Sequence, residues 1–271
     1  MIKKGEIIKL EIIDHAFVGK GISKLNIKDR DYIVFVQHGI KGQIVNAKIT
    51  KKKPKYAEGN ITEIIQHSPL EKTTKFQPIS GAPYINLPIE EQKKMKIQMT
   101  KEVFTKIGKI KDIDSLFDQW ISSPFNYHYR NKMEYSFSSI GYNSNTDEVI
   151  DNTFALGFKR KGTWWIVENL NKDSGLFDQK LESNLFEIRN YLEKTGLPAW
   201  HPPKKEGFFR HLVVRKSFSN KQLLFNLVTS SNSLNKFDIP AFGNYLKEIL
   251  GERMAGPVSY THLTLPTSYP V

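Results

Sequence analysis

The chain has 271 residues, 39% of them hydrophobic, and carries 40 lysines and arginines against 28 acidic residues. A net charge of +12 favours a polyanionic partner, with nucleic acid first and a membrane surface second, and an inert basic surface as the alternative. The absence of cysteine excludes disulfides, thiolate metal sites and a cysteine nucleophile from these residues. The polar start and the lack of an apolar run of about 18 residues predict a cytoplasmic protein with no membrane association.

Residues 1–69 are predicted to form a small β-barrel. Short strands are expected at 6–13, 32–36, 43–50 and 58–66, with glycine-containing turns between them. Residues 1–70 contain 13 Lys+Arg and 7 Asp+Glu, so half of the net charge lies in about a quarter of the chain. Tyr56 follows a lysine cluster, an arrangement typical of single-stranded RNA binding, in which cations bind phosphate and an aromatic ring stacks on a base. A solvated lysine-rich turn is the alternative.

A linker at 70–88 and a helix at 89–111 are expected next. Asn86 is a candidate cap, Pro88 lies near the start and Gly108 ends the pattern. Every fourth residue of the helix is apolar, which we interpret as a packing stripe. The stripe consists of Met95, Met99, Val103 and Ile107.

Residues 112–256 are predicted to form a mostly antiparallel α+β domain. Strands are expected at 131–140, 153–158, 164–167, 209–217 and 222–229, hairpin turns at 161–162 and 220–221, and helices at 179–195 and 239–250.

One of these strands opens with a polar, cationic segment. In the sequence YRNKMEYSFS, Arg130, Asn131 and Lys132 open a strand whose apolar residues alternate, so they form a hydrogen-bonding head at the end of a half-buried strand. An ordinary amphipathic strand is the alternative. Alternation also places His211 and Arg215 on one face of the 209–217 strand, with Arg210 opposite. His211 is either an RNA contact or a structural histidine, and we favour the second.

Two of these segments resemble RumA/TrmA-type RNA uracil-C5 methyltransferases. YRNKMEYSF is similar to the family segment YRNKMEFSF, and residues 208–229 are similar to a strand reading roughly LRHLVVR with its hairpin. Residues 19–69 resemble a TRAM domain, an OB-like barrel that presents RNA to an attached modifying enzyme. The early glycines, the VFV strand at 34–36 and the exit Ser68–Pro69 all match. Because the transfer-RNA branch lacks this domain, the resemblance implies a RumA/RlmD-type 23S rRNA enzyme.

The resemblance also implies an iron–sulfur loop in the linker. The positions of its ligands are Thr73, Ile79, Ala82 and, approximately, Lys172. None of these side chains ligates iron, so we expect no cluster. A packed loop is expected instead, with apolar contacts from Ile79 and Tyr84.

In this family a cysteine attacks the uracil ring, and a Rossmann-like domain binds S-adenosylmethionine through a glycine-rich loop. Neither feature occurs in the 271 residues. The expected fold class is therefore a β-rich α+β chain, with an OB-like TRAM barrel and a central α+β domain, in which the Rossmann-like methyltransferase domain is absent. We expect the helix at 89–111 to pack on that missing domain. This fragment is expected to be inactive alone and not to bind the methyl donor.

The last residues differ in character from the rest of the chain. VSYTHLTLPT, at 258–267, resembles the translation of a transposase sequencing adapter. We therefore expect 257–271 to be a read-through tail that continues no strand or helix, and the native sequence to end near 251–255. A natural flexible tail is the alternative.

The expected function is RNA recognition within an S-adenosylmethionine-dependent 23S rRNA uracil-C5 methyltransferase that forms 5-methyluridine and acts as a monomer. A stand-alone RNA-binding protein and a basic scaffold for an acidic protein are the alternatives. No catalytic, cofactor-binding or metal-ligating residue is predicted. The predicted RNA contacts are Lys20, Lys51, Lys52, Lys53, Lys55, Tyr56, Arg130, Asn131, Lys132 and Arg215.

Overall fold

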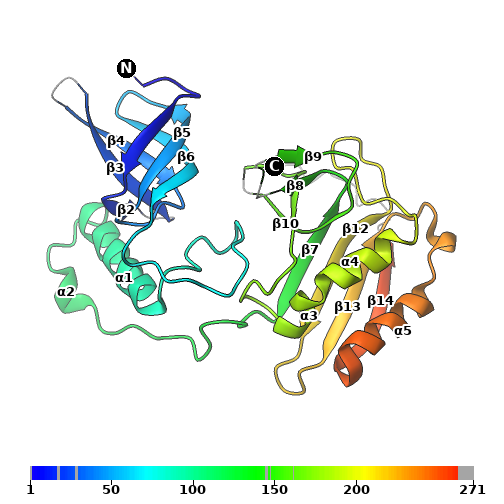
Figure 1. Ribbon diagram of the computed structural model, residues 1–271. Helices are drawn as coiled ribbons and strands as arrows, with labels where there is room; N and C mark the ends of the chain where they lie inside the picture. Colours follow the sequence, from blue (N-terminus) through cyan, green and yellow to red (C-terminus); the bar gives the residue numbers. More distant parts are fainter. Residues whose placement is uncertain are drawn as a thin grey trace, which may run out of the picture. The chain divides into compact units, whose positions relative to one another are not determined.

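The computed structural model describes residues 2–16, 19–27, 30–143, 146, 148–160 and 162–261, with only the backbone described at 257–261. The chain divides into two units (Figure 1). The N-terminal unit comprises Met1–Thr74 and Ala82–Pro124, and the C-terminal unit comprises Lys75–Gly81 and Phe125–Val271. Each unit is built around its own sheet.

The N-terminal unit contains a curled six-stranded sheet in the order β1-β5-β6-β4-β3-β2. The edge strands β1 and β2 are separated in the chain only by Ile12 and Ile13. The Ile12 amide donates to the Gln43 carbonyl at 2.9 Å, and the Ile13 amide donates to the Ile22 carbonyl at 2.8 Å. These bonds bring both edges of the sheet together. The strands are β1 Ile7–Glu11, β2 Asp14–Ala16, β3 Lys20–Ile27, β4 Arg30–Gln37, β5 Ile44–Lys52 and β6 Tyr56–Gln66.

Strand β3 was not predicted, and its buried residues explain why. Two of its inward positions are Gly21 and Ser23 rather than apolar residues, so the expected alternation of hydrophobic side chains is missing. A Cβ atom at Gly21 would lie 2.7 Å from the Ile12 side chain and 2.9 Å from the Gly39 carbonyl. The strand therefore needs glycine there to approach its neighbours closely.

Helices α1 (Ile89–Lys106) and α2 (Ile113–Leu116) also belong to the N-terminal unit. Helix α1 begins after Pro88, not at the predicted cap Asn86. Its residue Met95 forms a small core with Ile40 and Leu87. The stripe is buried only in this half of the helix, because Ile107 at the other end is 77% exposed.

The C-terminal unit contains an eight-stranded sheet in the order β14-β13-β12-β7-β10-β11-β8-β9. The pairs β13–β14 and β8–β11 are parallel, and the other neighbouring pairs are antiparallel. The strands are β7 Lys132–Ser138, β8 Gly141–Asn143, β9 Glu148–Ile150, β10 Ala155–Lys159, β11 Val167–Asn169, β12 Phe209–Lys216, β13 Leu223–Thr229 and β14 Met254–Thr261. The predicted strand at 164–167 is shifted, since β11 starts at Val167.

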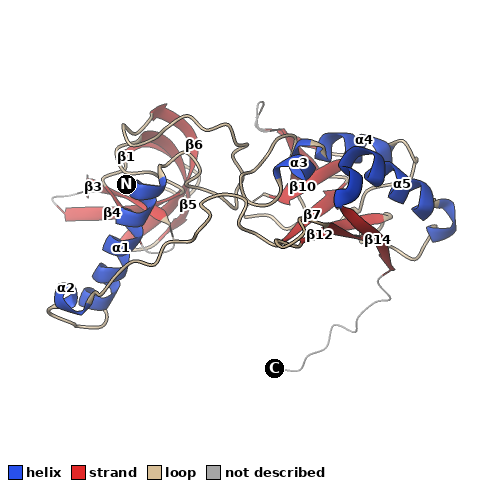
Figure 2. Ribbon diagram, turned by 90° about the horizontal axis from the view of Figure 1, so that it is seen from below, coloured by secondary structure: helices blue, strands red, loops and turns tan. Residues whose placement is uncertain are grey.

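Helices α3 (Gln179–Ser183), α4 (Leu185–Glu193) and α5 (Ile239–Leu250) cover one face of this sheet (Figures 1 and 2). Short 3-10 turns at Leu234–Lys236 and Gly251–Arg253 flank α5. The helix predicted at 179–195 is divided into α3 and α4 at Asn184. Tyr135 of β7 is fully buried beneath α3 and donates to Glu182 at 3.0 Å, which identifies the helix-covered face as the core.

The segment after Leu250 differs from its prediction. We expected no strand there, but Met254–Thr261 forms β14 and pairs in parallel with β13 along its whole length. The expectation of an irregular start to the tail is therefore wrong. The adapter origin of 257–271 stays a prediction, and residues 262–271, like Lys161 of the predicted hairpin turn, lie outside the described residues.

Candidate nucleic-acid interface

The predicted lysines of the N-terminal unit gather around the β5–β6 hairpin. Lys20 Nζ and Lys51 Nζ contact the carboxylate of Glu58 at 2.6 and 3.1 Å. Hydrogen bonds from Lys20 and then Lys51 hold the pKa of Glu58 below its ordinary value, so this acid stays ionised. Two of the predicted cations are thus ion-paired. Lys51 nevertheless remains exposed, and Lys52, Lys53 and Lys55 add further exposed charge to the hairpin.

Tyr56 is less available for base stacking than the sequence suggested. It is half-buried, and its ring packs edge-on against Phe35 with centroids 5.7 Å apart. A residue that sequence reasoning missed organises the hairpin: the Tyr32 hydroxyl lies 2.7 Å from the carbonyl oxygens of both Lys53 and Tyr56. The single O–H of Tyr32 is shared between these two carbonyls, and this contact fixes the backbone that carries the lysines.

In the C-terminal unit the backbone of the Arg130–Lys132 head is held and its side chains are exposed. The Arg130 amide donates to the Leu176 carbonyl at 3.1 Å, and the Asn131 carbonyl accepts from the Lys216 amide at 2.8 Å. All three side chains of the head are exposed. Because the backbone is already ordered, binding a partner would cost only the ordering of these exposed side chains.

Arg215 joins this head through strand pairing. It lies opposite Lys132 in the β7–β12 register, on the sheet face away from the helices, and both side chains are exposed. The predicted contacts of this unit therefore converge at one end of β7 and β12.

His211 lies farther along the same face of β12. Its Nδ1 atom is 3.4 Å from both Ser136 Oγ and Glu134 Oε1. These contacts fit a structural histidine. Arg210 does not simply alternate with it, because the register shifts there, and its guanidinium lies 4.4 Å from the centre of the Trp200 ring.

A groove of about 860 Å³ opens on the helix-covered side of the same strand ends. Its basic lining comes from Lys180, Lys216, Lys221 and Arg253. Asp178 lies at its base, 2.6 Å from Arg253 Nη2 and 3.1 Å from Lys216 Nζ. Sequence reasoning missed these residues because they come from segments far apart in the chain.

The charge state of Asp178 follows from two opposing effects. Burial alone would raise its pKa, but hydrogen bonds from Arg253, the Leu181 amide and Lys216 together hold the pKa below its ordinary value. A buried aspartate in this environment remains charged. The groove therefore contains one carboxylate against four cations, and its net charge is positive.

Beneath the groove lies a second buried acid, Glu182. It accepts hydrogen bonds from the Ser174 amide and hydroxyl, both at 2.7 Å, and from the Tyr135 hydroxyl. Burial raises the pKa of Glu182 to about 7. Because Glu182 is fully buried, we assign it a structural role.

The linker positions aligned with cluster ligands are divided between the two units. Thr73 and Ala82 belong to the N-terminal unit, whereas Ile79 and Lys172 belong to the C-terminal unit. Ile79 is buried, and Lys172 is exposed. Tyr84, the other residue expected to fill the loop, packs against the core of the N-terminal unit.

Residues 75–81 are fastened to the C-terminal unit by Gln77. Its side chain donates to the Asn169 carbonyl at 2.7 Å and accepts from the amides of Asn171 and Lys172 at 2.8 and 3.1 Å. Phe76 next to it packs directly on Gly175, whose φ of +74° suits glycine. The loop is thus ordered by hydrogen bonds and packing.

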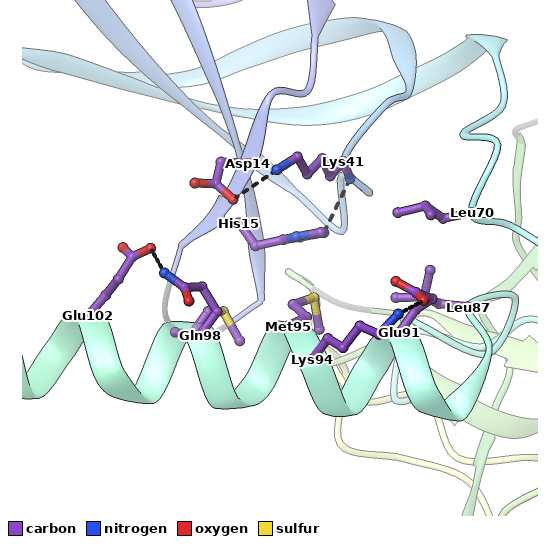
Figure 3. A pocket seen from close by; sticks show the side chains of 11 residues that line it. Asp14, His15, Lys41, Leu70, Leu87, Glu91, Lys94, Met95, Gln98 and Glu102 are labelled. Atoms are coloured by element: carbon purple, nitrogen blue, oxygen red, sulfur yellow. Dashed lines mark hydrogen bonds and ion pairs between the residues drawn. The ribbon is translucent and has the colours of Figure 1, made fainter. Parts of the chain in front are cut away.

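A smaller pocket of about 280 Å³ lies between β2 and α1 in the N-terminal unit (Figure 3). His15 Nε2 accepts from the Lys41 amide at 3.2 Å, and Lys41 Nζ lies 4.0 Å from Asp14. Burial lowers the pKa of His15, with the positive charge of Lys41 acting in the same direction and Asp14 opposing it. These polar groups are engaged with one another, so we assign the pocket a structural role.

In the described part of the chain, no helix is long and apolar enough to cross a bilayer.

Comparisons with known proteins show which proteins the chain resembles. Residues 3–62 match the TRAM domain family. The chain is 36% identical over 238 residues to an uncharacterized RNA methyltransferase of Caldanaerobacter subterraneus, covering 87% of this chain and 49% of that protein. It is 29% identical over 251 residues to one of Clostridium tetani, covering 92% and 51%. The chain thus spans about half the length of these curated relatives.

The fold also resembles a solved enzyme. The tRNA (uracil-54, C5)-methyltransferase of Pyrococcus abyssi, solved with S-adenosyl-L-homocysteine, matches 84% of this chain and 49% of its own, with a TM-score of 0.54 and 16% identity. The predicted β-rich chain with a TRAM domain is confirmed. The likeness to this enzyme overturns the other part of the predicted fold class, the absence of a methyltransferase domain. Residues 3–62 thus form a TRAM domain, within a chain that is homologous to RNA methyltransferases.

Proposed function

We propose that this chain recognises the substrate of an S-adenosylmethionine-dependent RNA uracil-C5 methyltransferase, with 23S rRNA as the RNA, and that it acts as a cytoplasmic monomer. The observation that carries the proposal is the end of β7 and β12, where Arg130, Lys132 and Arg215 are exposed on an anchored backbone. The exposed lysines of the TRAM hairpin and the homology to RNA methyltransferases support it.

The two basic regions have different roles in this proposal. The hairpin lysines bind phosphates, which gives affinity without sequence preference. The Arg130–Asn131 head has donors and an acceptor that can pair with base edges of a folded loop. RNA is therefore held by charge in the TRAM domain and read by the head on β7.

The methyl donor does not fit the groove described above. S-adenosylmethionine carries a positively charged sulfonium, whereas the groove is lined by four cations with one carboxylate. Uracil-C5 methylation also requires a nucleophile at C6, and these residues include no cysteine. We therefore assign RNA recognition, and no chemical step, to the residues of this site.

A stand-alone RNA-binding protein is the second candidate. Such a protein is expected to bury its own apolar stripe, yet Ile107, the last stripe residue and the C-cap of α1, is 77% exposed. Phe104, which lies next to the stripe on α1, is 48% exposed. This exposure favours a protein in which α1 contacts further protein surface.

The proposal is tested by RNA binding. Arg130→Glu and Lys132→Glu together should weaken binding of an rRNA hairpin at least ten-fold and reduce the salt dependence of the affinity. Lys247→Glu, an exposed lysine of α5, is the matched control. Unchanged affinity and salt slope in the double variant would contradict the assignment.

Two further measurements separate the alternatives. Heparin or an acidic peptide that binds as tightly as RNA would indicate a basic scaffold instead. The chain alone is expected to transfer no labelled methyl group from S-adenosylmethionine to rRNA, since it has no thiol nucleophile. Methylation by this chain would overturn that expectation.

A further inference from the structure

Two exposed phenylalanines stand in parallel at the groove of the C-terminal unit. The rings of Phe125 and Phe218 are 3° from parallel, with centroids 6.3 Å apart. Both line the groove, and they are 59% and 48% exposed. Large apolar rings of a folded protein are usually buried, so an exposed parallel pair inside a groove indicates a surface for a flat ligand.

Cations lie next to these rings. Lys216 Nζ is 5.5 Å from the centroid of Phe218, and Lys221, in the turn between β12 and β13, is exposed on the same groove. The Lys221 carbonyl accepts from Arg253 Nε at 3.2 Å, which holds this turn in place. Positive charge beside a flat apolar surface matches a ligand that combines an aromatic ring with an anion.

The groove is built on a rigid base. Asp178 caps α3 by accepting from the Leu181 amide at 3.1 Å, and its other contacts fix Lys216 and Arg253. His128 Nε2, at another side of the groove, lies 2.9 Å from Asp173. Because these groups are already positioned, a ligand would bind without the cost of ordering them.

We propose that this groove binds one unpaired nucleotide of RNA, whose base stacks on the Phe125–Phe218 pair while its phosphate lies against Lys221 and the neighbouring cations. The inference rests on the proposed RNA function and deepens it by specifying a single-stranded segment, because a paired base cannot offer its face to the rings. An acidic protein segment would satisfy the cations but leave the aromatic pair without a role.

The test uses the whole chain and RNA labelled with 2-aminopurine. A ten-nucleotide single strand and a duplex of the same sequence are titrated with wild type, Phe125→Leu/Phe218→Leu, Lys221→Gln and two controls. The controls, Phe186→Leu on α4 and Lys247→Gln on α5, alter exposed residues outside the groove. Urea unfolding confirms that each variant is folded.

We expect wild type to quench 2-aminopurine and to bind the single strand more tightly than the duplex. The phenylalanine double variant should lose the quenching and weaken single-strand binding at least about five-fold, while duplex binding stays the same. Lys221→Gln should weaken single-strand binding and retain quenching at saturation. The two controls should behave as wild type.

The test distinguishes failure of the nucleotide groove from failure of the proposed RNA function. If wild type binds RNA and the phenylalanine double variant quenches and binds equally well, the nucleotide groove is disproved while the proposed function stands. If wild type binds neither RNA, the proposed function fails and the inference with it. If a poly-glutamate peptide competes with the single strand and the phenylalanine double variant binds that peptide normally, the groove serves an acidic protein.

Discussion

Lys132 and Arg215 lie directly opposite each other on the antiparallel strands β7 and β12. Like charges in such a cross-strand pair repel, at a cost of a few tenths of a kcal/mol to about 1 kcal/mol. Glu134 Oε2 lies 3.7 Å from Lys132 Nζ and offsets only part of this repulsion. A pair of exposed cations held together on a sheet is well placed to bind phosphate, because an anion between them would remove the repulsion.

The pair can be tested by neutralising both side chains. Lys132→Gln/Arg215→Gln should lower RNA affinity and reduce the slope of log affinity against log salt by about 1.4, since each contact with a single strand contributes about 0.7. The free energy of unfolding should stay the same or rise slightly as the repulsion disappears. Fluorescence anisotropy at several salt concentrations measures the slope, with Lys247→Gln as control. An unchanged slope would remove these residues from the interface.

The TRAM hairpin offers a test that leaves the charge unchanged. Tyr32→Phe removes only the hydroxyl that donates to the Lys53 and Tyr56 carbonyls. The hairpin should become more mobile, so its amides should exchange faster and RNA affinity should fall a few-fold. Tyr245→Phe on α5 is the matched control. If hydrogen exchange rises while RNA affinity stays constant, the ordered hairpin is not required for binding.

Parts of this structure were predictable because local patterns coincide with burial. Strand β7 alternates Met133, Tyr135 and Phe137 toward the core, so its position was predicted from period-two hydrophobicity. The TRAM barrel was predicted through its glycines and its VFV strand. Strand β3 was missed because glycine and serine occupy its inward positions.

The groove could not be predicted from local patterns. Phe125, Lys180, Phe218 and Arg253 belong to four separate segments, and only the folded sheet brings them together. In the sequence, Phe218 follows a strand and reads as an ordinary loop residue. Tertiary pairing, which sequence periodicity does not report, creates the site.

Gln77 is expected to hold the linker segment on the C-terminal unit. Gln77→Ala removes three hydrogen bonds and leaves the amides of Asn171 and Lys172 without this acceptor. Unfolding of the unit should become easier by about 1–3 kcal/mol, and proteases should cleave near residues 75–81 sooner. Gln98→Ala, an exposed glutamine of α1 in the other unit, is the control. Identical proteolysis of wild type and Gln77→Ala would show that the packing of Phe76 and the backbone hydrogen bond from the Gln77 amide to the Asp173 carbonyl order the loop without the Gln77 side chain.

Asp178 should stabilise the groove mainly through its negative charge rather than through its role as the cap of α3. Asp178→Asn keeps a side-chain acceptor for the cap of α3 but leaves Lys216 and Arg253 without a counter-ion. We expect a loss of about 2 kcal/mol at neutral pH, less than for a fully buried pair because Arg253 is partly exposed. The matched control is Asp238→Asn, because Asp238 caps α5 in the same way.

The pH dependence of this variant follows from the sign of the shift. Folding lowers the pKa of Asp178. The contribution of Asp178 to the free energy of unfolding is therefore fully present above the ordinary pKa of aspartate, and it is lost as pH falls through the lower pKa of the folded state. Wild type should therefore lose stability in acid relative to Asp178→Asn. The free energy of unfolding is measured in urea at decreasing pH. If it falls in parallel for wild type and Asp178→Asn, the ion pairs of Asp178 with Lys216 and Arg253 contribute no net stability.

Glu182 should produce the opposite dependence. Burial raises the pKa of Glu182 on folding to about 7. The contribution of Glu182 to the free energy of unfolding is therefore most favourable below the ordinary pKa of glutamate, and it is lost as pH rises through about 7. Wild-type stability should fall between about pH 4.5 and 7, by an amount on the order of 2–3 kcal/mol. Glu182→Gln, which cannot ionise, should show a flatter profile in urea unfolding, whereas Glu187→Gln on α4 should retain the decline. If the Glu182→Gln profile declines as steeply as wild type, the hydrogen bonds from Ser174 and Tyr135 keep the carboxylate ionised in the folded protein, and its burial carries no penalty that depends on pH in this range.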